Sequence, residues 1–369
     1  MPLPTTYKDR IPMPLKETIQ LEDYRMRYAT HRTDEDLLLS HKLLPWIPVW
    51  DDHEIANNGW MGGSTSPIWM RLEFTSWEQR VRNGLRAYFE WMPVRQVDAD
   101  DSMRIWRNFK IGKLADLILL DTRYYDRDET DRPDLRDVED RSIMGAKQEQ
   151  WLYGQLKDSA RRNVSWTVLG QQIQFSAINE TAIGSSSKDL PLYWDGWSGY
   201  AANRRRVLEA MVSSNVSSPV VLTGDYHTLW TAELCWDDLA GYDHVSGEGS
   251  LGLELAVTSV TSRNGYGPLS YQQSFEVSKR LVRDNAFLKW AEGYYRGYFE
   301  LELRREALEA KYFAVPDVSR RNTEEREIAR WRSEAGSRRF TRPFGEVTEG
   351  AVQKAVEEWA LEGITGERR

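Results

Sequence analysis

The chain has 369 residues, of which 40% are hydrophobic and 29% charged, a composition that fits a globular protein with a substantial core and excludes a largely disordered chain. Its formal net charge of −8 argues against non-specific nucleic-acid binding, which depends on cations that neutralise phosphates. The lone cysteine, Cys235, excludes an internal disulfide and a thiolate metal cluster, and no apolar run reaches the roughly 18 residues of a membrane-spanning helix.

The first third of the chain is predicted to be mainly helical. Helical periodicity predicts helices within residues 15–32, 33–44 and 75–91. Capping-box spacing supports the starts of the last two helices, with Thr33 paired to Asp36 and Thr75 paired to Glu78.

From residue 103 onward, strands and helices alternate, which predicts an α/β layered domain. Strands are expected within residues 103–123 (two strands around Gly112, the second one buried), 165–175, 218–234, 251–262 and 294–303, and helices within 146–162, 202–214 and 271–293. We assign residues 1–317 to one domain and expect the charge-rich residues 318–369 to form a solvated helix or tail.

Acidic, imidazole and amide side chains are concentrated in residues 49–60, "VWDDHEIANNGW", directly after the apolar segment 46–50. If that segment is a strand, its alternation sends Asp51 and His53 to one face and Asp52 to the other. A cluster at the carboxyl end of a strand in an α/β sheet is a candidate ligand site. The alternative is a strand-end turn with an aspartate cap.

A second cluster has the same construction. The apolar run "VVLT" stops at Gly224, and Asp225 and His227 follow with a spacing that places them on the same side. The alternative is a structural histidine beside a turn aspartate. In a chain with five histidines, two such clusters favour a functional interpretation.

A third segment, "LILLDTRYYDRD", ends a predicted buried strand with Asp121 and Arg123 on one face. Arginine is suited to gripping a tetrahedral oxyanion through two hydrogen bonds. The alternative is an aspartate–arginine pair that closes the end of the strand.

Oxygen ligands together with imidazole suit divalent cations such as Ca, Mg or Mn, or iron. Two such ions can clamp a phosphoryl group and supply a hydroxide for in-line attack, so phosphate ester hydrolysis is the leading chemical hypothesis. The 16 tryptophans suggest a carbohydrate-binding module as an alternative, but most lie in apolar patterns typical of core packing.

The chain resembles the PhoD-like (alkaline phosphatase D) metallophosphatases over roughly residues 18–315. The segments that carry the resemblance include "WIPVWDDHEIANN", "LLDTRYYDRD", "GAKQEQWL", "WDGWSGYAANR" and "VVLTGDYHTLW". The first and last of these are specific in combination. The resemblance implies a four-layer α/β/β/α sandwich, hydrolysis of small phosphate esters, and Ca and Fe, or else Mn or Mg, as metal ions.

The resemblance also implies roles for individual residues. The metal ligands would come from Asp51, Asp52, Asn57, Asn58, Asp225 and His227, with the two asparagines either ligating or orienting. His53 would stabilise the transferring phosphoryl group or protonate the leaving oxygen, Asp52 would act with it in catalysis, and Arg123 would contact the substrate.

Members of this family carry an earlier block in which a strand bears a metal ligand and a Gly-Asp-Tyr type segment supplies the aspartate that bridges the metals. No Gly-Asp precedes Asp51, so we expect the sandwich to be incomplete at its N-terminus. The alternative function is therefore a catalytically impaired or inactive member. Sequons at Asn163, Asn179 and Asn215 and the resemblance suggest a secreted protein, although the first residues lack the apolar stretch of a signal peptide.

Overall fold

The computed structural model describes residues 11–66, 75–184 and 192–354, and the chain forms two compact units. The helical unit comprises Met1–Arg107, Leu120–Thr130 and Ser142–Gln148, and the sheet unit comprises Asn108–Leu119, Asp131–Arg141 and Glu149–Arg369. Among the described residues, no helix is long and apolar enough to cross a membrane.

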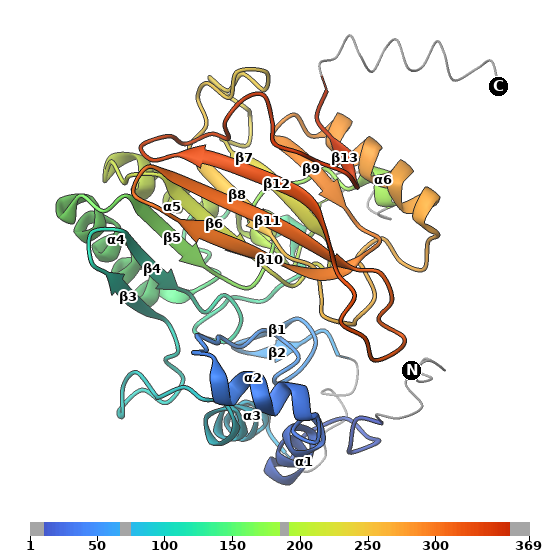
Figure 1. The fold of residues 1–369 in the computed structure, drawn as a ribbon. Coiled ribbons are helices and arrows are strands. Elements are labelled where there is room, and N and C mark those ends of the chain that lie inside the picture. The colour runs from blue at the N-terminus through green and yellow to red at the C-terminus, as the bar shows by residue number, and fades with distance from the viewer. Residues whose placement is uncertain (1–10, 67–74, 185–191, 355–369) are drawn as a thin grey trace. The chain divides into compact units, whose positions relative to one another are not determined.

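The described part of the helical unit consists of helices and a short hairpin, labelled in Figure 1. These elements are α1 (Leu21–His31), α2 (Glu35–Leu43), α3 (Trp77–Trp91), β1 (Gly59–Trp60) and β2 (Gly63–Ser64). Asp34 caps α2 and Ser76 caps α3, because each side chain accepts a hydrogen bond from the backbone N–H three residues further on. The capping boxes predicted from Thr33 and Thr75 are therefore wrong by one residue.

The core of the helical unit surrounds Trp50. This fully buried side chain packs edge-on against Tyr88 and Phe89 of α3, with ring centroids 5.4 and 5.8 Å apart. The strand predicted over residues 46–50 is wrong, because this segment forms no regular element. Pro48 has no N–H to donate to a sheet, so the segment is held by the burial of its last side chain instead.

The sheet unit contains a mixed sheet of eight strands in the order β13-β9-β7-β8-β6-β5-β4-β3. Its strands are β3 (Arg107–Ile111), β4 (Ala115–Leu119), β5 (Trp166–Gly170), β6 (Pro219–Thr223), β7 (Leu229–Leu234), β8 (Gly252–Ala256), β9 (Leu288–Glu292) and β13 (Ala351–Val352). Strands β4, β5, β6 and β8 are parallel, whereas β7 is antiparallel to β8 and β9. The continuous burial of β5 and β8 explains their nearly unbroken apolar sequences.

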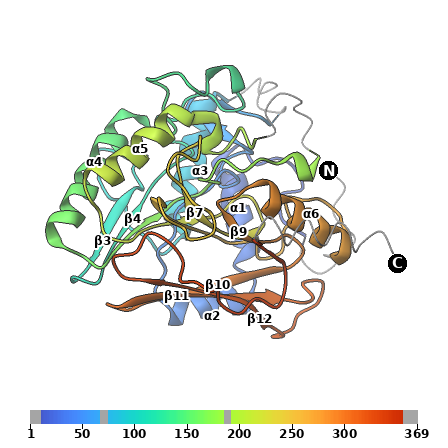
Figure 2. The same cartoon turned by 90° about the horizontal axis from the view of Figure 1, so that it is seen from above.

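A second, antiparallel sheet packs on one face of the large sheet, and helices cover the opposite face (Figure 2). The small sheet is made of β10 (Arg296–Leu303), β11 (Ala307–Val315) and β12 (Arg326–Glu334), and the helices are α4 (Gly145–Arg162), α5 (Ala201–Ser213) and α6 (Tyr271–Asp284). Along β7, Leu229 joins the core between the sheets and Trp230 joins the core beneath α6. The predicted α/β class is confirmed, and the sheet unit supplies an α/β/β arrangement.

The outer face of the small sheet carries mainly charged side chains, together with the stacked rings of Tyr298 and Phe313. Lys311 of β11 is paired with Glu300 of β10 on one side and with Arg330 of β12 on the other. It therefore has one oppositely charged and one like-charged neighbour across the strands. No helix of the described sheet unit packs on this face. The charges suit contact with water.

The helix predicted over residues 271–293 ends earlier than expected. Helix α6 stops at Asp284, and the Asn285 side chain donates a hydrogen bond to the carbonyl of Leu281. The following residues form β9, whose side chains reach both faces of the large sheet. Trp290 packs in the core between the sheets, and Leu288 and Ala291 pack in the core beneath α6.

The prediction that residues 318–369 form a helix or tail is wrong for their central part. Residues 326–334 form β12, in which Trp331 is fully buried between the sheets. The alternation of charged and apolar residues fits a half-buried strand, and the high charge obscured that pattern. Residues 355–369 lie outside the described part of the chain.

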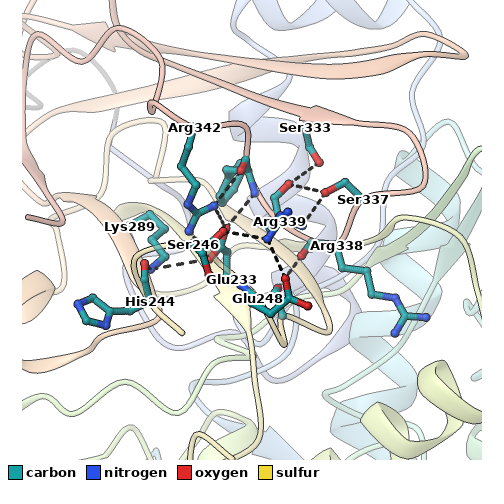
Figure 3. Close-up of polar contacts among 12 residues, drawn as sticks. Glu233, His244, Ser246, Glu248, Lys289, Ser333, Ser337, Arg338, Arg339 and Arg342 are labelled. Atoms are coloured by element: carbon teal, nitrogen blue, oxygen red, sulfur yellow. Dashed lines mark hydrogen bonds and ion pairs between the residues drawn. The ribbon is translucent and has the colours of Figure 1, made fainter. Parts of the chain in front are cut away.

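The segment after β12 is tied to the large sheet through Glu233 of β7 (Figure 3). The buried Glu233 carboxylate accepts hydrogen bonds from both terminal nitrogens of Arg342, at 2.5 and 2.8 Å, and from the backbone N–H of Phe340 at 2.9 Å. The Lys289 ammonium lies 3.7 Å from the same carboxylate. Gly247 allows the Arg342 guanidinium to approach, since a Cβ there would lie 2.8 Å from it.

Seven of the tryptophans in the described part of the chain lie in the cores of the two units. Those that are fully buried are Trp50, Trp106, Trp166, Trp197, Trp230, Trp290 and Trp331. Side chains enclosed in this way cannot form an exposed platform for a sugar ring, so they give no support to a carbohydrate-binding module.

Candidate metal-binding residues

The segment after Trp50 folds into a compact turn organised by Asp52. This residue is 4% exposed, and its two carboxylate oxygens accept hydrogen bonds from the backbone N–H groups of His53, at 2.6 Å, and Asn58, at 2.9 Å. Each oxygen has a second lone pair, so Asp52 keeps the capacity to ligate a cation. The turn predicted as the alternative interpretation is therefore present, and it leaves a ligand role open.

Tyr124 stabilises this turn through its buried hydroxyl group. The hydroxyl donates a hydrogen bond to the Asp52 carbonyl at 2.5 Å and lies 3.1 Å from the Ala56 carbonyl oxygen. Gly59 is required beside it, because a Cβ at that position would lie 2.4 Å from the Tyr124 ring. A tyrosine 72 residues further along the chain gave no sequence signal for this role.

Arg123 contacts Asp51. Its Nε lies 2.6 Å from Oδ1 of Asp51, and the guanidinium side chain is fully buried whereas the Asp51 side chain is 35% exposed. The arrangement fits a role in orienting Asp51 through a charge-assisted hydrogen bond. The substrate contact predicted for Arg123 gains no support from this placement.

Asp121 closes the end of β4 and is fully buried. Its carboxylate accepts from the backbone N–H groups of Arg123 and Tyr124, at 2.9 and 3.0 Å, and the Gln148 side-chain amide bonds to its backbone. Asp121 therefore binds the backbone of Arg123 and not its guanidinium. Burial raises the pKa of Asp121 to about 6, although the two backbone hydrogen bonds act in the opposite direction.

We expect Asp121→Asn to flatten the pH dependence of the unfolding free energy. The raised pKa means that Asp121 contributes stability that is full below its unfolded pKa of 3.8 and is lost as the pH rises through about 6, on the order of 3 kcal/mol in total. An asparagine does not titrate, so this loss should be missing from urea unfolding curves between pH 4 and 7. Identical pH profiles in the two proteins would contradict the assignment.

The remaining candidates of the helical unit lie on the surface of the turn. The His53 side chain is 76% exposed, and its Nε2 lies 3.8 Å from Oδ2 of Asp52. The Asn57 side-chain amide donates to Thr65 at 3.0 Å, and Asn58 adopts a positive φ of 47° that the turn requires. The His53 side chain is therefore accessible to a ligand from solvent.

In the sheet unit, Asp225 and His227 lie in the turn between β6 and β7. Both have left-handed backbone conformations, with φ of 64° and 58°, which non-glycine residues rarely adopt and which cluster at functional sites. Strand β6 ends at Thr223, so strand alternation does not set the directions of these side chains.

The imidazole of His227 is held in one tautomer. Its Nδ1 lies 2.6 Å from the carbonyl oxygen of Arg263. A carbonyl only accepts hydrogen bonds, so Nδ1 carries the proton of the neutral ring and Nε2 keeps its lone pair. A metal-ligating histidine usually donates its other ring N–H to a backbone carbonyl or a carboxylate in this way.

Asp225 is oriented by a tyrosine. The Tyr193 hydroxyl donates to Oδ2 of Asp225 at 2.8 Å, and the same hydroxyl lies 3.3 Å from Oδ2 of the fully buried Asp195. We did not predict Tyr193 or Asp195, although both are in or beside the segment "WDGWSGYAANR" that carried part of the resemblance.

These donor sets fit a divalent cation. In the helical unit, the carboxylates of Asp51 and Asp52 offer oxygen atoms; in the sheet unit, Asp225 offers a carboxylate oxygen and His227 offers Nε2 of its imidazole. The observation that favours a ligand role over a structural one is the fixed His227 tautomer within a strained turn.

The chain is similar to proteins that are described as phosphatases. The sequence profile of a family described as "PhoD-like phosphatase" matches residues 4–312. Alkaline phosphatase D of Bacillus subtilis (strain 168) is 33% identical over 312 residues, which are 82% of this chain and 50% of that protein. A solved structure described as "Structure of PhoD" aligns with a TM-score of 0.72 and 29% identity, covering 96% of this chain and 67% of the other. The chain thus spans half the length of the curated relative.

Proposed function

The chain belongs to the PhoD-like phosphatase family, and we propose that it is a metal-dependent phosphoric ester hydrolase acting on small phosphate esters. The observation that carries this proposal is the turn after β6. There a carboxylate oriented by Tyr193 and an imidazole with a fixed tautomer are held on a strained backbone.

We propose that Asp51, Asp52, Asn57 and Asn58 of the helical unit and Asp225 and His227 of the sheet unit supply the metal ligands. Bound divalent cations would neutralise phosphoryl charge and lower the pKa of a coordinated water. Ca and Fe are the metals that the family resemblance implies, and Mn or Mg suit the same oxygen-rich donor set.

The protein's own residues then have distinct tasks. Arg123 holds the Asp51 carboxylate in place, and the Asp52 carboxylate holds the turn that presents His53. His53 is exposed enough to reach a phosphate ester, and it acts on the phosphoryl group or gives a proton to the leaving oxygen. His227 keeps its Nδ1 proton on the Arg263 carbonyl and offers Nε2.

Replacing Asp225 by asparagine tests the ligand assignment. We expect the loss of Mn²⁺ affinity to exceed the roughly 10–100-fold that removal of an outer-shell partner costs, and hydrolysis of p-nitrophenyl phosphate to fall with metal content. Asp52→Asn should behave in the same way. The control is Asp238→Asn, which changes an exposed carboxylate that accepts a hydrogen bond from the Ala240 N–H in the turn after β7.

Isothermal titration of the metal-free proteins with Mn²⁺ and elemental analysis provide the measurements. Comparing p-nitrophenyl phosphate with bis-p-nitrophenyl phosphate assigns monoesterase or diesterase activity. If the Asp225→Asn protein binds Mn²⁺ and turns over like the control, Asp225 is not a ligand.

A further inference from the structure

We propose that Glu254 of β8 is a positioning residue that fixes the turn carrying Asp225 and His227. It acts through Thr223, the last residue of β6, which precedes that turn. This inference rests on the proposed function and extends it to a residue that lies behind the candidate ligands.

The Glu254 side chain is fully buried and accepts three hydrogen bonds. Its Oε1 accepts from the Thr223 hydroxyl at 2.7 Å and from the Phe175 N–H at 2.9 Å, and its Oε2 accepts from the Ser176 N–H at 3.0 Å. A carboxylate is costly to bury unless hydrogen bonds replace those that water would make. These hydrogen bonds come from two parts of the chain, so Glu254 joins the end of β6 to the segment that follows β5.

Gln171 determines which way the Thr223 hydroxyl donates. The side-chain oxygen of Gln171 accepts from the N–H of Ile173 and from Nε1 of Trp197, both at 3.1 Å, so its amide nitrogen faces Oγ1 of Thr223, at 2.9 Å. The Thr223 oxygen receives this hydrogen bond and gives its own proton to Glu254. Chains of hydrogen bonds with one direction strengthen one another inside a protein, which makes this link more rigid.

The backbone carries the position of this segment to the turn. The Gly224 N–H donates to the Gln172 carbonyl at 2.9 Å, and this hydrogen bond continues the pairing of β5 and β6 beyond the ends of both strands. Asp225 follows directly, with its left-handed φ of 64°. A displacement of the segment that Glu254 holds therefore displaces the start of the turn.

The same segment supports the partner of the Asp225 side chain. The Trp197 N–H donates to the Gln174 carbonyl at 3.1 Å, and the Trp197 ring packs against Phe175 with ring centroids 5.0 Å apart. Tyr193 lies four residues before Trp197, and its hydroxyl donates to Oδ2 of Asp225 at 2.8 Å. Both the backbone and the side chain of Asp225 thus depend on residues that Glu254 holds.

The test separates the Thr223 hydroxyl from the volume of the side chain. Thr223→Val removes the hydroxyl at almost the same volume, whereas Thr223→Ser keeps it. The control is Thr167→Val, because Thr167 of β5 is also fully buried but its hydroxyl has no hydrogen-bond partner within the described part of the chain. Mn²⁺ affinity of the metal-free proteins is measured by isothermal titration, and stability by urea unfolding.

We expect Thr223→Val to weaken Mn²⁺ binding roughly 3–30-fold, the range by which residues without ligand contact modulate a site. Thr223→Ser should bind within about twofold of the wild type, and Thr167→Val should bind like the wild type. Glu254→Gln should weaken binding at least as much as Thr223→Val, because one oxygen and an NH₂ group cannot accept from all three donors. Wild-type affinity in Thr223→Val would overturn the proposal.

Hydrogen exchange of the Gly224 amide tests the positioning without metal. In metal-free Thr223→Val, the protection of this amide should fall at least about tenfold more than that of the β8 amides, which report global unfolding, and Thr223→Ser should restore it. A wild type that binds no Mn²⁺ but shows this pattern would refute only the proposed function. Equal Gly224 protection in Thr223→Val and Thr223→Ser would overturn the inference, whatever the metal measurement shows.

Discussion

Replacing His53 by alanine should lower the turnover of a phosphate ester by roughly 10²–10⁴-fold, the usual contribution of a positioned acid or base, while metal content stays near that of the wild type. The imidazole is 76% exposed and stands beside Asp52 at the edge of a well-ordered turn, so its removal leaves the fold and the carboxylates in place. Turnover of p-nitrophenyl phosphate and elemental analysis of the same preparations are the measurements.

His31→Ala is the control for this experiment, since His31 is an exposed residue in the last turn of α1 of the same unit. A parallel loss of metal and turnover in His53→Ala would make His53 a metal ligand instead. Unchanged turnover would remove it from the mechanism altogether.

Replacing Glu233 by alanine should destabilise the protein by about 3–5 kcal/mol, the cost of removing one partner from a buried ion pair. The loss leaves the Arg342 guanidinium and the fully buried Lys289 without their carboxylate, and it removes the acceptor of the Tyr242 hydroxyl. Burial already lowers the pKa of Lys289 to about 8, although Glu233 acts in the opposite direction. Removing Glu233 should lower that pKa further, so Lys289 is expected to become neutral.

The control is Glu248→Ala, which removes an exposed partner of Arg339 from the same region (Figure 3). That carboxylate lies 3.2 Å from the arginine but its side chain is 78% exposed, so the cost should be about 1 kcal/mol or less. Urea unfolding measures both costs, and limited proteolysis should cut the segment after β12 sooner in Glu233→Ala. Equal stabilities of the two variants would show that Glu233 does not clamp this segment.

Much of the sheet unit could be predicted from local patterns. The two strands around Gly112 and the alternating strand β10 lie within the predicted ranges, and the helices α4 and α5 begin one residue before theirs. Their signals are hydrophobic periodicities that need no knowledge of distant residues. Boundaries were less predictable, because Asp34 and Thr33 are both capable caps and only the geometry of the folded turn selects one.

The errors concern segments whose structure depends on distant partners. Residues 318–369 are rich in charge, yet Trp331 is buried because β12 pairs with β11 and faces the large sheet. Residues 46–50 are apolar, yet they form no strand, and Trp50 is anchored on α3 instead. The partners of these two tryptophans lie far away in the sequence, so the composition of the local segment does not reveal them.

By itself, the sequence determined the α/β class and which residue types gather at the two candidate turns, because apolar runs, aspartates and histidines are visible as local spacing. The tertiary structure decided what those residues do. Arg123 is bound to Asp51, which is 72 residues away, and the His227 tautomer is set by the carbonyl of Arg263, 36 residues away. Hydrogen bonds of this kind depend on distances of about 3 Å between atoms that only the folded chain brings together, so no periodicity in the sequence encodes them.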